Sequence, residues 1–93
     1  MNITLAFGHA LKRARAFKNL TQEDFSQVSS RTYVSTLERG VYAPTLAKID
    51  SLANRIGIHP LTLISMAYLL ENPEIDSIKL FEQVQLELNN LQR

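Results

Sequence analysis

Hydrophobic residues recur at three- and four-residue steps along most of the chain, which is the spacing of amphipathic helices. Prolines, glycines and capping residues divide this pattern into six helical stretches, and no segment reads convincingly as a strand. The first stretch spans about residues 3–18. The last spans about residues 75–91 and carries one apolar stripe, made by Ile78, Phe81, Val84, Leu88 and Leu91. The pattern therefore predicts an all-α protein.

Two short helices joined by a very tight turn are predicted within residues 20–45. Thr21 is a good N-cap for the first of them, and Ser29-Ser30 ends it and can cap the next. The next helix runs from about Arg31 to Arg39, and Gly40 closes it in a left-handed conformation. Its outer face carries small polar, guanidinium and phenol side chains, which suit the major groove of DNA better than a buried core.

Two longer helices follow this pair. Thr45 caps a fourth helix that Gly57 ends, and His59-Pro60 opens a fifth, because proline is tolerated at the first helical position. The fifth helix is apolar on nearly all its sides, so it is either central in the domain or covered by a partner. The last helix likewise either pairs with a second subunit or folds back over its own domain.

Charge is divided unevenly along the chain although the net charge is only +1. Residues 1–45 hold six cations against three acids, whereas residues 46–93 hold four cations against six acids. A basic N-terminal half and an acidic C-terminal half are typical of a DNA-binding protein that has a separate surface for a partner. The alternative is that these charges simply solvate a small domain.

Composition limits the other classes of function. The 93 residues allow one small domain, and the absence of cysteine excludes disulfides and thiolate metal sites. The two histidines lie far apart and no catalytic group of residues stands out, so we expect no enzyme activity, no metal and no cofactor. There is no apolar run of membrane-spanning length and no signal-peptide pattern, so we expect a cytoplasmic protein that does not enter a membrane.

Five motifs resemble the Cro/cI (Xre) family of helix-turn-helix regulators, and they lie at residues 20–25, 31–35, 37–40, 44–46 and 52–57. The Arg-Thr-Tyr-Val-Ser segment is especially similar to the small controller proteins of restriction–modification systems. The resemblance implies a five-helix, lambda-repressor-like DNA-binding domain over residues 1–71. Residues 72–93 then form an additional C-terminal helix for dimerisation or docking.

The chain departs from this family in one place. Family members usually carry two more residues between the second and third helices, including a turn glycine. Here Val28-Ser29-Ser30-Arg31 makes the turn without them. The shortening bears on the angle between the two helices and on where the recognition helix starts.

The outer face of the third helix supplies the predicted base contacts, because arginine can fork onto guanine and threonine can meet a thymine methyl. These residues are Arg31, Thr32, Ser35 and Thr36. The resemblance implies a phosphate contact for Gln22 at the start of the second helix. We expect further phosphate contacts from Thr21, Tyr33, Arg39 and Tyr42. All of these residues have the alternative of an ordinary solvated face, and the two tyrosines could instead pack against the protein.

The resemblance also implies a structural ion pair between Glu38 and Arg15 of the first helix. One small DNA-binding domain makes too few contacts to distinguish its site from the rest of a genome. We therefore expect a homodimer that binds a near-palindromic operator. The predicted dimer interface comprises Leu63, Tyr68, Ile78, Phe81, Val84 and Leu88.

The sequence thus predicts a DNA-binding transcriptional regulator, with repression favoured over activation and no small-molecule effector expected. The operator, the regulated genes and the sign of regulation stay open. The alternative is a protein-interaction module, similar to an antitoxin, in which DNA binding is secondary and the last helix is the docking element.

Overall fold

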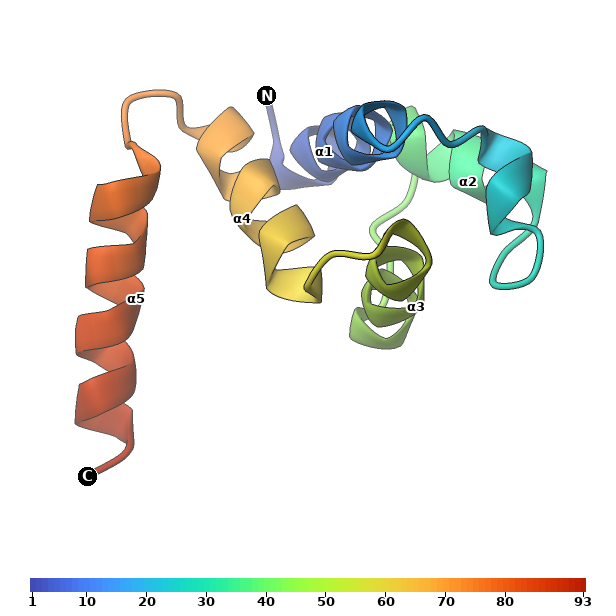
Figure 1. The fold of residues 1–93 in the computed structure, drawn as a ribbon. Helices are drawn as coiled ribbons and strands as arrows, with labels where there is room; N and C mark the ends of the chain where they lie inside the picture. The colour runs from blue at the N-terminus through green and yellow to red at the C-terminus, as the bar shows by residue number, and fades with distance from the viewer.

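The computed structural model describes all 93 residues and consists of helices joined by short loops (Figure 1). In chain order the elements are α1 (Ile3–Phe17), the 3-10 helix η1 (Gln22–Phe25), α2 (Arg31–Glu38), α3 (Leu46–Ile56), α4 (Pro60–Glu71) and α5 (Ser77–Leu91). The all-α prediction is confirmed. The second stretch is tighter than expected, because its α-helical pattern is replaced by one short 3-10 segment followed by turns. No helix is long and apolar enough to cross a membrane.

Local capping chemistry sets where the elements begin and end. Each begins after a residue whose side chain accepts a backbone N–H of the first turn: Asn2, Thr21, Ser30, Thr45, His59 and Asp76. Gly40 and Gly57 follow α2 and α3 with φ values of 75° and 90°, in the left-handed region where glycine carries no Cβ penalty. These caps agree with the sequence pattern at Thr21, Thr45, Gly40 and Gly57.

The hydrophobic core lies where α1, α2, α3 and α4 meet. Its largest fully buried side chains are Phe25, Leu11, Leu37, Leu52, Leu63 and Val34. Burying one such side chain stabilises the fold by about 1.5–3 kcal/mol relative to leaving it exposed. Leu63 is 1% exposed, so its predicted role at a dimer interface is wrong. It faces inward because α4 packs against α1, which the all-round apolar pattern of α4 could not reveal.

A close backbone approach joins α1 to the end of α2. A Cβ built on Gly8 would lie 2.5 Å from the carbonyl oxygen of Leu37 and 2.7 Å from that of Glu38. No side chain fits there, so only glycine allows this approach. The contact anchors the inner side of α2 on α1 and leaves the opposite side of α2 facing away from the core.

The last helix stands apart from the rest of the chain on the far side of α4 (Figure 1). None of its residues is buried, and Ile78 and Phe81 are 68% and 52% exposed. A groove of about 450 Å³ opens between α4 and α5, with Leu61, Met66, Leu69 and Phe81 in its lining. The alternative in which this helix folds back over its own domain is therefore not the arrangement of this structure.

Candidate nucleic-acid interface

The candidate interface is built on α2. Val34 and Leu37 are fully buried and fasten one side of this helix to the core. Ser30 begins the helix, because its hydroxyl oxygen accepts the N–H of Tyr33 at 3.0 Å. The opposite side is not covered by any other part of the chain: Arg31, Thr32 and Arg39 are exposed, and Ser35 and Thr36 are half-buried.

The predicted base-contact residues differ in how free their side chains are. The Arg31 side chain is 69% exposed and lies 3.9 Å from a carboxylate oxygen of Glu23, a surface ion pair worth little energy. Arg31 can therefore leave this partner at little cost. The hydroxyl of Thr36 donates to the carbonyl oxygen of Tyr33 at 2.7 Å, so its proton is already used within the helix. Its methyl group and its oxygen lone pairs remain for a partner.

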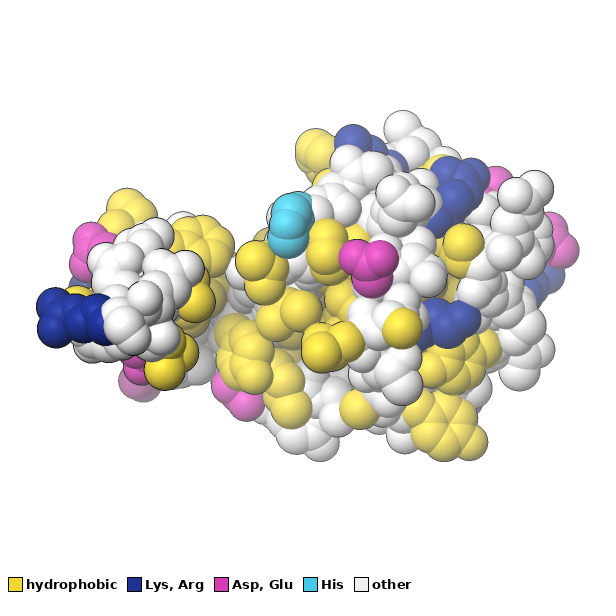
Figure 2. All heavy atoms as spheres, turned by 90° about the horizontal axis from the view of Figure 1, so that it is seen from below, with side chains coloured by type: hydrophobic (Ala, Val, Ile, Leu, Met, Phe, Trp, Pro, Cys, Tyr) yellow, Lys and Arg dark blue, Asp and Glu magenta, His cyan; other side chains and the backbone are white.

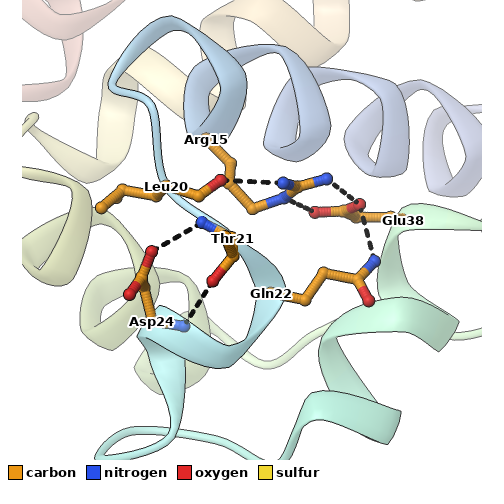
Figure 3. A network of polar contacts seen from close by, with 6 residues as sticks. All are labelled: Arg15, Leu20, Thr21, Gln22, Asp24 and Glu38. Atoms are coloured by element: carbon orange, nitrogen blue, oxygen red, sulfur yellow. Dashed lines mark hydrogen bonds and ion pairs between the residues drawn. The ribbon is translucent and has the colours of Figure 1, made fainter.

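The start of η1 is closed by a reciprocal capping box (Figure 3). The N–H of Thr21 donates to a carboxylate oxygen of Asp24 at 2.6 Å, and the N–H of Asp24 donates to the Thr21 hydroxyl oxygen at 3.3 Å. The hydrogen bonds from the Thr21 backbone and then from its hydroxyl hold the pKa of Asp24 below its ordinary value of 3.8. The backbone N–H of Thr21 is thus not a free donor for a phosphate.

A four-residue network of Arg15, Leu20, Gln22 and Glu38 ties η1 to α1 and α2 (Figure 3). The Arg15 guanidinium donates to both carboxylate oxygens of Glu38, from Nε at 2.7 Å and from Nη2 at 3.0 Å. Its Nη1 donates to the carbonyl oxygen of Leu20 at 2.8 Å. The hydrogen bond to Glu38 raises the pKa of Arg15 above its ordinary value, so the guanidinium stays charged. The pair expected from the sequence is therefore present as a partly buried, bidentate contact.

Gln22 belongs to this network too. Its side-chain amide donates to Glu38 at 3.1 Å, which turns the Gln22 side chain toward the protein (Figure 3). A side-chain amide has two N–H donors. One donor is used on Glu38, so one is left for the predicted phosphate contact.

The remaining predicted phosphate residues fall into two groups. Arg39 and Tyr42 are exposed beyond the C-terminal end of α2, and Tyr42 is 56% exposed. Tyr33 is half-buried and packs against the core, with the Lys48 ammonium 5.4 Å from the centre of its ring. Of the two roles considered for Tyr33, packing across the turn describes its ring in this structure.

Sequence reasoning missed two cations of α3 that reach this region. The Lys48 ammonium donates to the carbonyl oxygen of Val28 at 2.7 Å, and Nε of Arg55 donates to that of Asp24, also at 2.7 Å. These two cations are seven residues apart, two turns along one side of the helix. Both cations adjoin the buried residues Ile49, Leu52 and Ile56 in the helical pattern. That position was the one signal in the sequence that both side chains point toward a neighbouring element.

Comparisons with known proteins agree with this geometry. The sequence profile of the helix-turn-helix family matches residues 11–63, which include η1, α2 and α3. The control protein C.BamHI of Bacillus amyloliquefaciens is 35% identical over 66 residues, which are 68% of this chain and 82% of that protein. No solved structure matches significantly.

Proposed function

Because this chain belongs to the Xre-type helix-turn-helix family of DNA-binding transcriptional regulators, we propose that it binds a near-palindromic operator as a homodimer and represses transcription. The observation that carries this proposal is the outer face of α2, which has exposed polar and cationic side chains and no covering element. On this proposal Arg31, Thr32, Ser35 and Thr36 meet base edges.

Phosphate contacts would hold α2 in register on the duplex. Arg39 and Tyr42 are exposed at the C-terminal end of the helix, and Gln22, which contacts Glu38 at the same end, has one amide donor left. The Thr21 hydroxyl is also at that end, in the exposed first residue of the capping box. On this proposal these groups hold the C-terminal end of α2 against the sugar-phosphate backbone.

A second copy is the natural occupant of the apolar surfaces that one chain leaves open. On α5, six apolar residues form a stripe roughly 160° wide at 100° per residue: Ile78, Leu80, Phe81, Val84, Leu88 and Leu91. That stripe is wider than the narrow seam of a two-stranded coiled coil, so it favours contact with two helices at once. An isolated helix of this length is also marginal in water without packing.

The second surface lies beside the first. Tyr68 of α4 is 47% exposed, and Leu61 of the same helix is 60% exposed. Figure 2 shows the molecule from below, with hydrophobic side chains gathered on the part of the main body that lies next to α5. We propose that Tyr68, Ile78, Phe81, Val84 and Leu88 contribute to the two-fold interface. Two recognition helices would then enter successive major grooves ~34 Å apart.

Repression needs no contact beyond operator binding. A dimer that occupies two successive major grooves over a promoter excludes polymerase from the same DNA. Activation would require an additional surface that touches polymerase. The simpler mechanism is the one we propose.

Selection of bound fragments from a random duplex library tests the DNA-binding part of this proposal. We expect enrichment of an inverted repeat, with binding that falls steeply with salt because phosphate contacts release counterions. A folded chain that binds no duplex at any salt concentration would favour the protein-interaction module instead. Transcription in vitro from a promoter that carries the selected site tests the sign, and increased transcript would contradict repression.

A further inference from the structure

The turn between η1 and α2 has few bonds of its own. Within it, the N–H groups of Val28 and Ser29 both donate to the carbonyl oxygen of Phe25, at 2.9 and 2.8 Å. The Ser30 hydroxyl then caps α2. No backbone hydrogen bond runs from α2 back to η1 across the turn. The angle between the two elements therefore depends on contacts made from outside the turn.

Lys48 of α3 makes such contacts at both ends of the turn. Its ammonium donates to the carbonyl oxygen of Val28, the first residue of the turn, at 2.7 Å. The same ammonium lies 5.4 Å from the ring centre of Tyr33, in the first turn of α2. Cations at this distance are attracted by the negative face of an aromatic ring. The Lys48 ammonium thus contacts both the first residue of the turn and the first turn of α2.

Arg55 supports this arrangement two turns further along α3. Its Nε donates to the carbonyl oxygen of Asp24 in η1 at 2.7 Å. Hydrogen bonds with a charged donor are about twice as strong as neutral ones. Through Lys48 and Arg55, α3 therefore contacts η1 at Asp24, the turn at Val28 and α2 at Tyr33.

We propose that Lys48 is a positioning residue for sequence recognition, because it sets the angle of α2 relative to η1 across the shortened turn. This inference rests on the proposed DNA-binding function. The half-buried Lys48 directs its ammonium to the Val28 carbonyl oxygen and the Tyr33 ring, so its proposed effect on DNA passes through α2. Its removal should loosen the angle of α2 and lower discrimination between sequences, while the number of phosphate contacts stays the same.

Lys48→Met is the primary test, because it keeps a long apolar side chain and removes the ammonium. Affinity for the selected operator and for random duplex is measured in wild type and variant over a range of salt. We expect the ratio of the two affinities to fall roughly tenfold, within the range that one base contact supplies. The slope of log affinity against log salt on random duplex should not change.

Two other variants calibrate this result. Lys48→Arg should restore most of the ratio, because a guanidinium can donate to the Val28 carbonyl oxygen and stack on the Tyr33 ring. Lys79→Met, on α5, removes an exposed cation whose side chain forms no hydrogen bond or ion pair, and it should leave the ratio unchanged. A slope reduced by about 0.9 in Lys48→Met would make Lys48 a phosphate ligand and overturn the proposal. An unchanged ratio would overturn it too.

Hydrogen exchange in the free protein separates this inference from the function on which it rests. Amides of residues 28–33 should exchange faster in Lys48→Met while those of α1 and α4 keep their protection. Unchanged exchange at residues 28–33 would refute the positioning role even if DNA is bound. If the wild-type protein enriches no sequence from the duplex library, the proposed function is refuted. The exchange data still test whether Lys48 positions α2. If Lys48→Met does not fold, Lys48→Gln, which keeps a shorter neutral donor, takes its place.

Discussion

Arg15 and Glu38 form a bidentate contact between α1 and the last residue of α2, with Nε of Arg15 2.7 Å from a carboxylate oxygen of Glu38. The two side chains are only 16% and 5% exposed. The same carboxylate accepts a hydrogen bond from Gln22, so three elements meet at one buried charge. The position of α2 therefore depends on a pair that does not itself face the proposed DNA surface.

Arg15→Ala should lower stability strongly, because it leaves the Glu38 carboxylate buried without its cation. The expected loss is ~3–5 kcal/mol in the free energy of unfolding, the usual cost of removing one partner of a buried pair. Chemical denaturation and the melting temperature measure it. Lys18→Ala removes an exposed cation at the end of the same helix and serves as the matched control. Equal losses in the two variants would contradict this role of the pair.

The capping box predicts a pH dependence. Hydrogen bonds from Thr21 lower the pKa of Asp24 in the folded state below its ordinary value of 3.8. The ionised carboxylate is therefore favoured by folding, and its contribution is complete well above pH 3.8 and is lost as the pH falls through the lowered pKa. Asp24→Asn should destabilise the protein at neutral pH, and the difference from wild type should shrink below pH 3.8. Urea unfolding at several pH values checks this, and a difference that persists at low pH would argue against it.

Gly8→Ala should destabilise the protein although alanine is the better helix former. The new Cβ would lie 2.5 Å from the carbonyl oxygen of Leu37, so α1 and α2 would have to separate. Overpacking of this kind costs about 1–3 kcal/mol in the free energy of unfolding. We expect a cost at the upper end of this range, because the atoms that the new Cβ meets belong to the backbone and cannot rotate away. Gly57→Ala is the comparison, since its Cβ meets no atom and only the positive φ is strained. Denaturation midpoints that rise in Gly8→Ala would refute the close approach.

Two arginines at opposite ends of α2 should have different effects on DNA binding. Arg31→Ala should relax base preference, with ~1–3 kcal/mol less discrimination at the base it contacts. Arg39→Ala should weaken binding to all sequences alike and reduce the salt slope by about 0.9. Titration of operator and random duplexes at several salt concentrations distinguishes them. If Arg31→Ala leaves selectivity across a randomised site unchanged, the base-contact assignment fails.

Truncation after Asn72 should weaken self-association without unfolding the core, because α5 contributes no buried residue. Sedimentation at several protein concentrations measures the subunit equilibrium, and circular dichroism checks the fold. Phe81→Glu in the full chain is a second probe, since it places a charge in the apolar stripe. If the truncated chain still forms dimers, the interface does not need α5 and we would assign it to α4 alone.

Local rules predicted most of the helices. The capping residue Thr45, the glycines at 40 and 57, and the inward Val34 and Leu37 all act through neighbours within one or two turns, which a sequence pattern contains. Leu63 shows where this reasoning stops. A helix that is apolar on every side gives no periodicity from which to choose its buried face, so the packing against α1 decides it.

The candidate site was predictable to a different extent. The exposed outer face of α2 follows from its amphipathic pattern. The direction of Gln22 and the contacts of Lys48 do not, because they depend on elements 16 and 20 residues away in the chain. Long polar side chains can turn toward solvent or toward the protein, and only the tertiary arrangement selects between these.

The separation of α5 from the body has a consequence for how the protein melts. Within one chain α5 borders α4 only across an open groove and contributes no buried residue, so its fraying is only weakly coupled to global unfolding. A dilute sample should lose helix in a broad early phase and then a sharp later one, which departs from two-state behaviour. If subunits associate, the two phases should become one. Calorimetric scans at several protein concentrations would therefore show whether the protein assembles, without any label.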